Sequence, residues 1–225
     1  LGFLHGEIRK LEPKIAREVN RVGMMVVVPH GRDSVLYDAM KLRQAPIIAT
    51  RSNARAVTNH KRNMTDEMLR LMASNGGVVQ LTMLANYLRE VPPNIELDSA
   101  IAAHRFKMKD IDKMTDEEKV FLRKEFQEIN EKYPTPPATV KHVVDHIDHI
   151  IKIAGINHVG IGCDFDGGGG IEGVFDASEV MNITIELVRR GYNEEQIAKI
   201  WGGNLIRVFK EVQAISERIK SDSSA

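Results

Sequence analysis

The sequence predicts an α/β fold in which parallel strands alternate with helices. Apolar runs of strand length occur at 24–28 and 46–50, and further strands are predicted at 77–83 and 158–163, with residues at helical spacing between each strand and the next. Alternation of this kind makes the strands parallel and the crossovers helical. A full eight-stranded barrel needs about 250 residues, so the four strands form either half of such a barrel or a small open sheet.

The first half of the chain alternates helix and strand three times. Leu11–Val22 has helical spacing and stops at Gly23, a residue type common just past a helix end. Asp33 suits the cap of a second helix, whose apolar stripe runs to Leu42. Thr65 precedes two acids at the positive end of a third helix, which we expect to close at Asn75–Gly76.

The alternation pauses over 84–137, which we interpret as a helical, lid-like insertion within a single domain spanning 1–225. Prolines interrupt the segment at Pro92–Pro93 and again near its end. Thr115-x-x-Glu118 has the pattern of a capping box and predicts the start of a charged helix. The segment is therefore expected to be mostly solvated.

Helical spacing returns after the insertion. A helix is expected over 139–154, before the fourth strand. Three closing helices are then predicted, at 177–190, 193–200 and 204–219.

Composition excludes several classes of protein. The 225 residues carry 31 basic and 31 acidic side chains, so the formal charge is zero. A protein that binds nucleic acid through phosphate contacts would show a basic excess, and we expect no nucleic-acid partner. The lone Cys163 excludes an internal disulfide. No signal peptide or apolar run of membrane-spanning length is present in the displayed chain, which favours a cytoplasmic location.

Candidate catalytic residues follow the predicted strands, because parallel α/β folds place their active groups at the carboxyl ends of strands. His30 follows the first strand and has the side chain most often used to bind zinc. Arg51 follows the second strand. Asp164 follows the fourth, where it could bind a metal or act as a general base. The alternatives are a hydrogen-bonded histidine and a turn-capping aspartate.

Three other features have a functional and a structural interpretation. The glycines at 160, 162 and 167–170 could cradle a phosphate, but their spacing departs from the dinucleotide fingerprint and favours a flexible active-site loop. The 142–149 helix carries three histidines and two aspartates without the His-Glu-x-x-His pattern. We interpret it as a hydrogen-bonded structural helix in which the aspartates pair with the histidines. Cys163 is interpreted as a small buried residue rather than a nucleophile.

Arginines after the second strand could clamp a substrate carboxylate. Arg55 and Arg62 both lie in this loop, and guanidinium binds carboxylate through two parallel hydrogen bonds. The alternative is that they only solvate the loop.

Several segments together resemble the membrane (renal-type) dipeptidase family, zinc peptidases of the amidohydrolase superfamily. The resemblance covers most of the chain outside the insertion. It is carried by Asn20–His30, Ala45–Ala56, Asn59–Asp66, Asn75–Val79, Val144–His149 leading into His158–Gly167, and Gly202–Phe209.

The resemblance implies a partial (β/α)8 TIM-type barrel comprising roughly its last four strands, and zinc-dependent hydrolysis of dipeptides at a two-zinc site. His30 resembles one of the two histidines that bind the second zinc. Asp164 resembles the catalytic aspartate that handles the proton of the attacking water, and Arg62 the arginine that holds the substrate carboxylate.

The chain departs from the family pattern at positions that matter for zinc. Arg51 stands where the family has the second histidine of that zinc, and a guanidinium has no lone pair with which to bind a metal. The family's His-x-Asp and bridging glutamate have no counterpart here. The alternative function is therefore a catalytically degenerate binding or scaffold protein.

Half a barrel would expose sheet edges. Such edges favour pairing with another chain. We therefore expect a homo-oligomer, or association with a missing N-terminal segment.

Overall fold

The structure is a computed structural model, and it describes residues 14–15, 17–28, 33–42, 44–90, 93–134 and 137–222. The chain divides into two compact units. The first comprises 1–90 and 138–225, and the second comprises 91–137. Each unit is described by itself.

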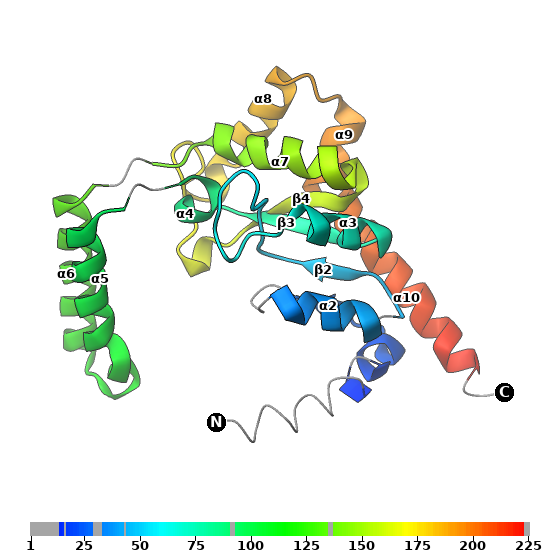
Figure 1. Cartoon of the computed structure of the whole chain (residues 1–225), viewed down its shortest axis with the longest axis horizontal. Coiled ribbons are helices and arrows are strands. Elements are labelled where there is room, and N and C mark those ends of the chain that lie inside the picture. The colour runs from blue at the N-terminus through cyan, green and yellow to red at the C-terminus, as the bar shows by residue number, and fades with distance from the viewer. Residues whose placement is uncertain are drawn as a thin grey trace. The chain divides into compact units, whose positions relative to one another are not determined.

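The first unit contains a four-stranded parallel sheet in the order β1-β2-β3-β4 (Figure 1). This confirms the predicted alternation of parallel strands with helices. Each strand is shorter than its apolar run, and β1 keeps only two residues. The strands are β1 Val26–Val27, β2 Ile47–Ala49, β3 Val78–Thr82 and β4 Val159–Cys163.

Helices pack against one face of this sheet, and together they form the larger of two apolar cores. All five residues of β3 are buried, as a central parallel strand with both faces covered requires. Figure 1 shows α3 and α7 beside one another along the sheet. The helices that contribute buried side chains to this core are α2 Asp33–Leu42, α3 Asp66–Ser74, α4 Ala85–Leu88, α7 Val140–Ala154 and α8 Met181–Arg189.

The opposite face packs on α10, which spans Asn204–Asp222. Val208 and Val212 of this helix are fully buried. They form a second, smaller core with Ile48 of β2 and Val78 of β3. The alternating side chains of the strands thus divide between two cores.

Helix ends follow the local chemistry of the sequence. The Thr65 hydroxyl accepts a hydrogen bond from the backbone N–H of Met68, which caps α3 as predicted. Gly23 has φ +83, a conformation in which glycine is unstrained, and it ends the helical residues 17–22. Leu11, the predicted start of that helix, lies outside the described residues.

The closing segment is more broken than predicted. The helix expected over 177–190 is a short 3-10 turn, Ala177–Glu179, followed by α8. The next helix, α9 (Glu194–Ala198), continues into a π-type turn, Lys199–Gly203, before α10 begins. This turn lies against β4, and its Ile200 is buried in the larger core.

The second unit is a pair of contacting helices. Thr115 and Glu118 form the predicted capping box at the start of α6. Leu97 and His104 are buried in the first helix and Leu122 in the second, and His104 Nδ1 lies 3.1 Å from the Glu125 carboxylate of the second helix. The elements are α5 Ile95–Lys107, the 3-10 segment Met108–Lys113 and α6 Asp116–Lys132.

None of the helices in the described part of the chain is long and apolar enough to cross a membrane.

Candidate functional site

Asp164 lies directly after β4, in a turn that backbone hydrogen bonds stabilise. Cys163 and Asp164 have φ +54 and +76, in the left-handed region that few residues other than glycine adopt. The backbone N–H groups of Gly167 and Gly169 donate to the Asp164 carbonyl, at 3.1 and 2.8 Å. These bonds hold the backbone of Asp164 at the carboxyl end of the strand. The Asp164 side chain is only 10% exposed.

Arg51 reaches this carboxylate from the end of β2. Its Nη1 donates to Oδ1 of Asp164 over 3.0 Å. The two residues are 113 positions apart, and the predicted convergence of strand-end residues is found for this pair. The result is a partly buried ion pair at the carboxyl edge of the sheet.

Gly162 explains how the ends of β2 and β4 come together, although β3 lies between these strands in the sheet. A Cβ atom at Gly162 would lie 2.4 Å from the Thr50 carbonyl oxygen and 3.0 Å from that of Leu81. The first contact is too close for a real side chain, and the second is tighter than most. Glycine at this position therefore lets β4 approach the residue that precedes Arg51.

The glycines after Asp164 serve the turn. A Cβ at Gly167 would lie 2.7 Å from Oδ1 of Asp164, and one at Gly169 would lie 2.5 Å from its carbonyl oxygen. The N–H of Gly170 donates to the Met83 carbonyl. Three N–H groups of this loop are thus engaged within the protein, which argues against the phosphate-binding interpretation.

The loop after Arg51 is anchored at Asn53, which is fully buried. Its side-chain amide donates to the Thr82 carbonyl and accepts from the Thr82 N–H, at 3.2 and 3.1 Å. Farther along, Arg55 binds both carboxylate oxygens of Asp33, at 2.9 and 2.8 Å. Arg55 is therefore engaged in a structural ion pair, and the interpretation of this residue as a substrate clamp is disfavoured.

Arg62 lies in a different group of contacts from the Arg51–Asp164 pair. Its guanidinium carbon is 6.0 Å from the centre of the Tyr87 ring, within the range of a cation–π interaction. The His60 ring stacks on the same tyrosine at 4.1 Å. Arg62 also lines, with Ser52, a small cavity of about 30 Å³, which is room for a water molecule rather than a dipeptide.

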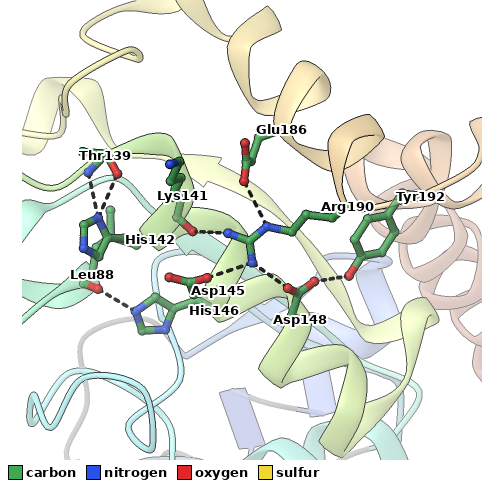
Figure 2. A network of polar contacts seen from close by, with 10 residues as sticks. All are labelled: Leu88, Thr139, Lys141, His142, Asp145, His146, Asp148, Glu186, Arg190 and Tyr192. Atoms are coloured by element: carbon green, nitrogen blue, oxygen red, sulfur yellow. Dashed lines mark hydrogen bonds and ion pairs between the residues drawn. The ribbon is translucent and has the colours of Figure 1, made fainter.

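His146 of α7 binds the loop that follows β2. The ring is fully buried, and its Nδ1 accepts a hydrogen bond from the Ala54 N–H over 3.0 Å. Its Nε2 lies 3.1 Å from the Leu88 carbonyl (Figure 2). The neutral ring with a proton on Nε2 therefore satisfies both this contact and the one to Ala54. Burial lowers the pKa of His146 to about 4.

The acidic residues of α7 pair with an arginine. Arg190 Nη1 donates to Asp145 and Asp148, at 2.8 and 2.7 Å, and its Nε donates to Glu186 (Figure 2). The expectation that the helix is a hydrogen-bonded structural element is confirmed. The expected pairing of its aspartates with its own histidines is wrong, because Arg190 takes both carboxylates.

The remaining histidines of α7 are also structural. His142 accepts from the Thr139 N–H over 3.1 Å and so caps the helix. His149 lies 2.7 Å from the Asp66 carboxylate of α3 and joins the two helices.

Cys163 is half-buried and packs against the larger core, and burial raises the pKa of its thiol. A raised pKa disfavours the thiolate, which agrees with the interpretation of this residue as structural.

Sequence reasoning missed Gly162, Asn53 and the buried role of His146, because their partners are distant in the chain.

His30, the predicted zinc ligand, lies outside the described residues. Among those that are described, no three His, Cys, Asp or Glu side chains gather in a group able to hold a metal ion. Beside Asp164 the nearest charged partner is the guanidinium of Arg51, which cannot ligate a metal. This donor set does not fit a zinc ion.

Residues 12–223 match the membrane dipeptidase family, peptidase family M19. The chain belongs to this family. An uncharacterized dipeptidase of Schizosaccharomyces pombe is 30% identical over 88% of this chain and 38% of its own length. Dipeptidase 3 of Rattus norvegicus is 28% identical over 91% of this chain and 33% of its own length. The chain thus spans about a third of the length of these curated relatives.

Solved structures in the same family have a similar fold. The crystal structure of the probable dipeptidase PvdM from Pseudomonas aeruginosa superposes with a TM-score of 0.74, at 32% identity, over 91% of this chain and 54% of that one. A metallo peptidase from Rhodobacter sphaeroides, liganded with a phosphinate mimic of the dipeptide L-Ala-D-Ala, superposes with a TM-score of 0.66 at 26% identity. The match covers 89% of this chain and 46% of that one.

Proposed function

We propose that this chain is part of a dipeptidase, a protein that hydrolyses the peptide bond of dipeptides, and that it forms roughly the last four strands of a (β/α)8 barrel. The family, the parallel sheet and the superposition on a structure that binds a dipeptide mimic support this proposal. The single observation that carries it is the place of Asp164, whose buried carboxylate lies at the carboxyl end of β4. Active sites of α/β barrels lie at that edge.

In this proposal the chain supplies a proton acceptor and a substrate anchor. Asp164 accepts the proton of the attacking water through the carboxylate oxygen that Arg51 leaves unbound. Arg62 binds the free α-carboxylate of the dipeptide with its guanidinium fork. Tyr87 and His60 hold the segment that carries this arginine.

Zinc is the cofactor that the family resemblance implies, and it supplies Lewis-acid chemistry when bound. The described donor set does not fit it, so no step here is assigned to a metal. Further ligands would come from His30 and from segments outside this chain.

Hydrolysis assays with paired substrates test the proposal. A free dipeptide and the same dipeptide with an amidated C-terminus are incubated with the protein, and released amino acid is measured. We expect cleavage of the free dipeptide only. D164N should lower kcat by about 100-fold or more, whereas R62Q should raise KM at least tenfold. The matched control is R70Q, which removes an exposed arginine on α3. Equal cleavage of the amidated substrate would contradict the role given to Arg62.

A second candidate function is dipeptide binding without hydrolysis. The Arg51–Asp164 ion pair favours it, because the carboxylate already has a cationic partner that is not a metal. Calorimetric titration with a free dipeptide distinguishes the two functions. Binding that R62Q weakens, with no amino acid released, would identify the protein as a binder.

Association with a partner follows from the sheet edges. In the described sheet, β1 and β4 each have a strand on one side only. We propose that a second copy of the chain, or an N-terminal segment of the same protein, pairs with these edges. Light scattering coupled to size-exclusion chromatography should report a species heavier than the 25.3 kDa chain. A monodisperse monomer would contradict this expectation.

A further inference from the structure

We propose that Arg51 is the cation resident beside Asp164, and that its guanidinium keeps a divalent metal ion from binding this carboxylate. The family's solved structures include proteins described as metallo peptidases. In this chain the place beside the strand-end carboxylate is taken by a side chain. The inference goes beyond the proposed function, whose tests use dipeptides rather than metal ions.

The geometry of the pair supports a fixed rather than a transient contact. Arg51 Nη1 lies 3.0 Å from Oδ1 of Asp164, and the carboxylate is nine-tenths buried. A buried carboxylate needs a positive partner or hydrogen-bond donors, because losing its hydration is costly. Arg51 supplies both to Asp164 through its Nη1.

Crowding on the other side of the carboxylate leaves little space for a second ligand. A Cβ at Gly167 would lie 2.7 Å from Oδ1 and 3.0 Å from Oδ2 of Asp164. Both oxygens therefore lie against the backbone of the turn. On this side the turn itself lies against the carboxylate.

The hydrogen bond from Nη1 holds the guanidinium 3.0 Å from Asp164, although the Arg51 side chain is 36% exposed. Its Nε is buried and has no hydrogen-bond partner among the described residues. The positive charge beside Asp164 repels an incoming divalent cation. Like charges a few ångströms apart interact strongly in a partly buried site.

Zinc titration of metal-stripped protein tests this inference. The full chain is titrated by competition with a chromophoric chelator, and zinc per chain is counted by elemental mass spectrometry. The variants are R51H, which adds a ligand, R51Q, which only removes the charge, and R51K, which keeps it. Each is measured with and without D164N, and only zinc binding that D164N abolishes is assigned to this position. Thermal melts check that each variant is folded.

We expect no Asp164-dependent zinc binding in the wild type or in R51K, and at least tenfold tighter binding in R51H. An increase in R51Q as well would support exclusion by charge. If R51H fails to fold, R51Q provides the test. Wild-type zinc binding that D164N weakens tenfold would overturn the inference, and so would R51H and R51Q titrations indistinguishable from the wild type. Dipeptide titration of the same samples reports on the proposed function separately.

Discussion

His146 Nδ1 accepts a hydrogen bond from the backbone N–H of Ala54, 92 residues earlier in the chain. The same ring contacts the Leu88 carbonyl through Nε2. One side chain of α7 thereby joins the loop that carries Arg62 to the segment after β3. The contact requires an unprotonated Nδ1, so the geometry of the candidate site is linked to pH.

This linkage predicts that stability falls as the solution is acidified. The pKa of His146 is about 4 in the folded protein, below the 6.5 of an ordinary histidine, so the unfolded chain binds the proton more tightly. The stabilisation is complete above pH 6.5 and is lost as the pH falls towards 4. Over that window the loss is about 3 kcal/mol at most.

Urea unfolding at several pH values measures the effect. H146Q should be less stable than the wild type at pH 7 and should lose less stability between pH 6.5 and 4. The control is H142Q, a half-buried histidine of the same helix, which keeps His146 and should keep the pH dependence of the wild type. Parallel pH profiles for wild type and H146Q would refute the assignment.

Arg190 and Arg189 form a matched pair for a second prediction. Arg190 donates to Asp145, Asp148 and Glu186, and also to the Lys141 carbonyl. R190A leaves three carboxylates without this partner and should lower the free energy of unfolding by roughly 1–3 kcal/mol.

The adjacent Arg189 is 71% exposed and lies 3.8 Å from Glu186. R189A should therefore change stability by less than about 0.5 kcal/mol. Denaturant midpoints of the two variants provide the comparison. Equal effects would show that the Arg190 network contributes no more than one exposed ion pair.

Local patterns in the sequence were sufficient to predict much of the fold. The run at 77–83, mostly apolar apart from Gln80 and Thr82, predicts β3 because a central parallel strand is buried on both faces. Thr65 predicts the start of α3 because its hydroxyl satisfies a backbone donor that the helix leaves free. Both signals depend on residues within one element.

The contacts of the site are less predictable because they join distant segments. Strand ends indicate that Arg51 and Asp164 share an edge, but not that they form an ion pair. The partner of Asp148 is a stronger example. The spacing on α7 suggests a neighbouring histidine as the partner of Asp148. The partner is instead Arg190, 42 residues away, which the packing of α8 on α7 brings close.

Asn53 provides a third prediction, about the anchor of the loop. N53A removes the donor to the Thr82 carbonyl and the acceptor for the Thr82 N–H, both in a fully buried place. Two buried backbone groups left unpaired should cost roughly 2–5 kcal/mol. The measurement is the free energy of unfolding in urea. N53D, which keeps the acceptor but loses the donor and adds a buried charge, should also be destabilised. A stable N53A would mean that water or another group takes over both bonds.

Gly162 provides the last prediction, because it ties the packing of the sheet to the Arg51–Asp164 pair. In G162A the new methyl group would lie 2.4 Å from the Thr50 carbonyl oxygen, so the ends of β2 and β4 must separate. Overpacking of this kind should lower the free energy of unfolding by roughly 1–3 kcal/mol. G160A is the matched control, since the Cβ there would meet Gln80 and Ile200 at an ordinary 3.4 Å. Because separation of the strands moves Arg51 away from Asp164, G162A should also increase Asp164-dependent zinc binding, in the direction of R51Q. A destabilised G162A with unchanged zinc binding would show that the close approach serves the sheet alone and does not hold the ion pair together.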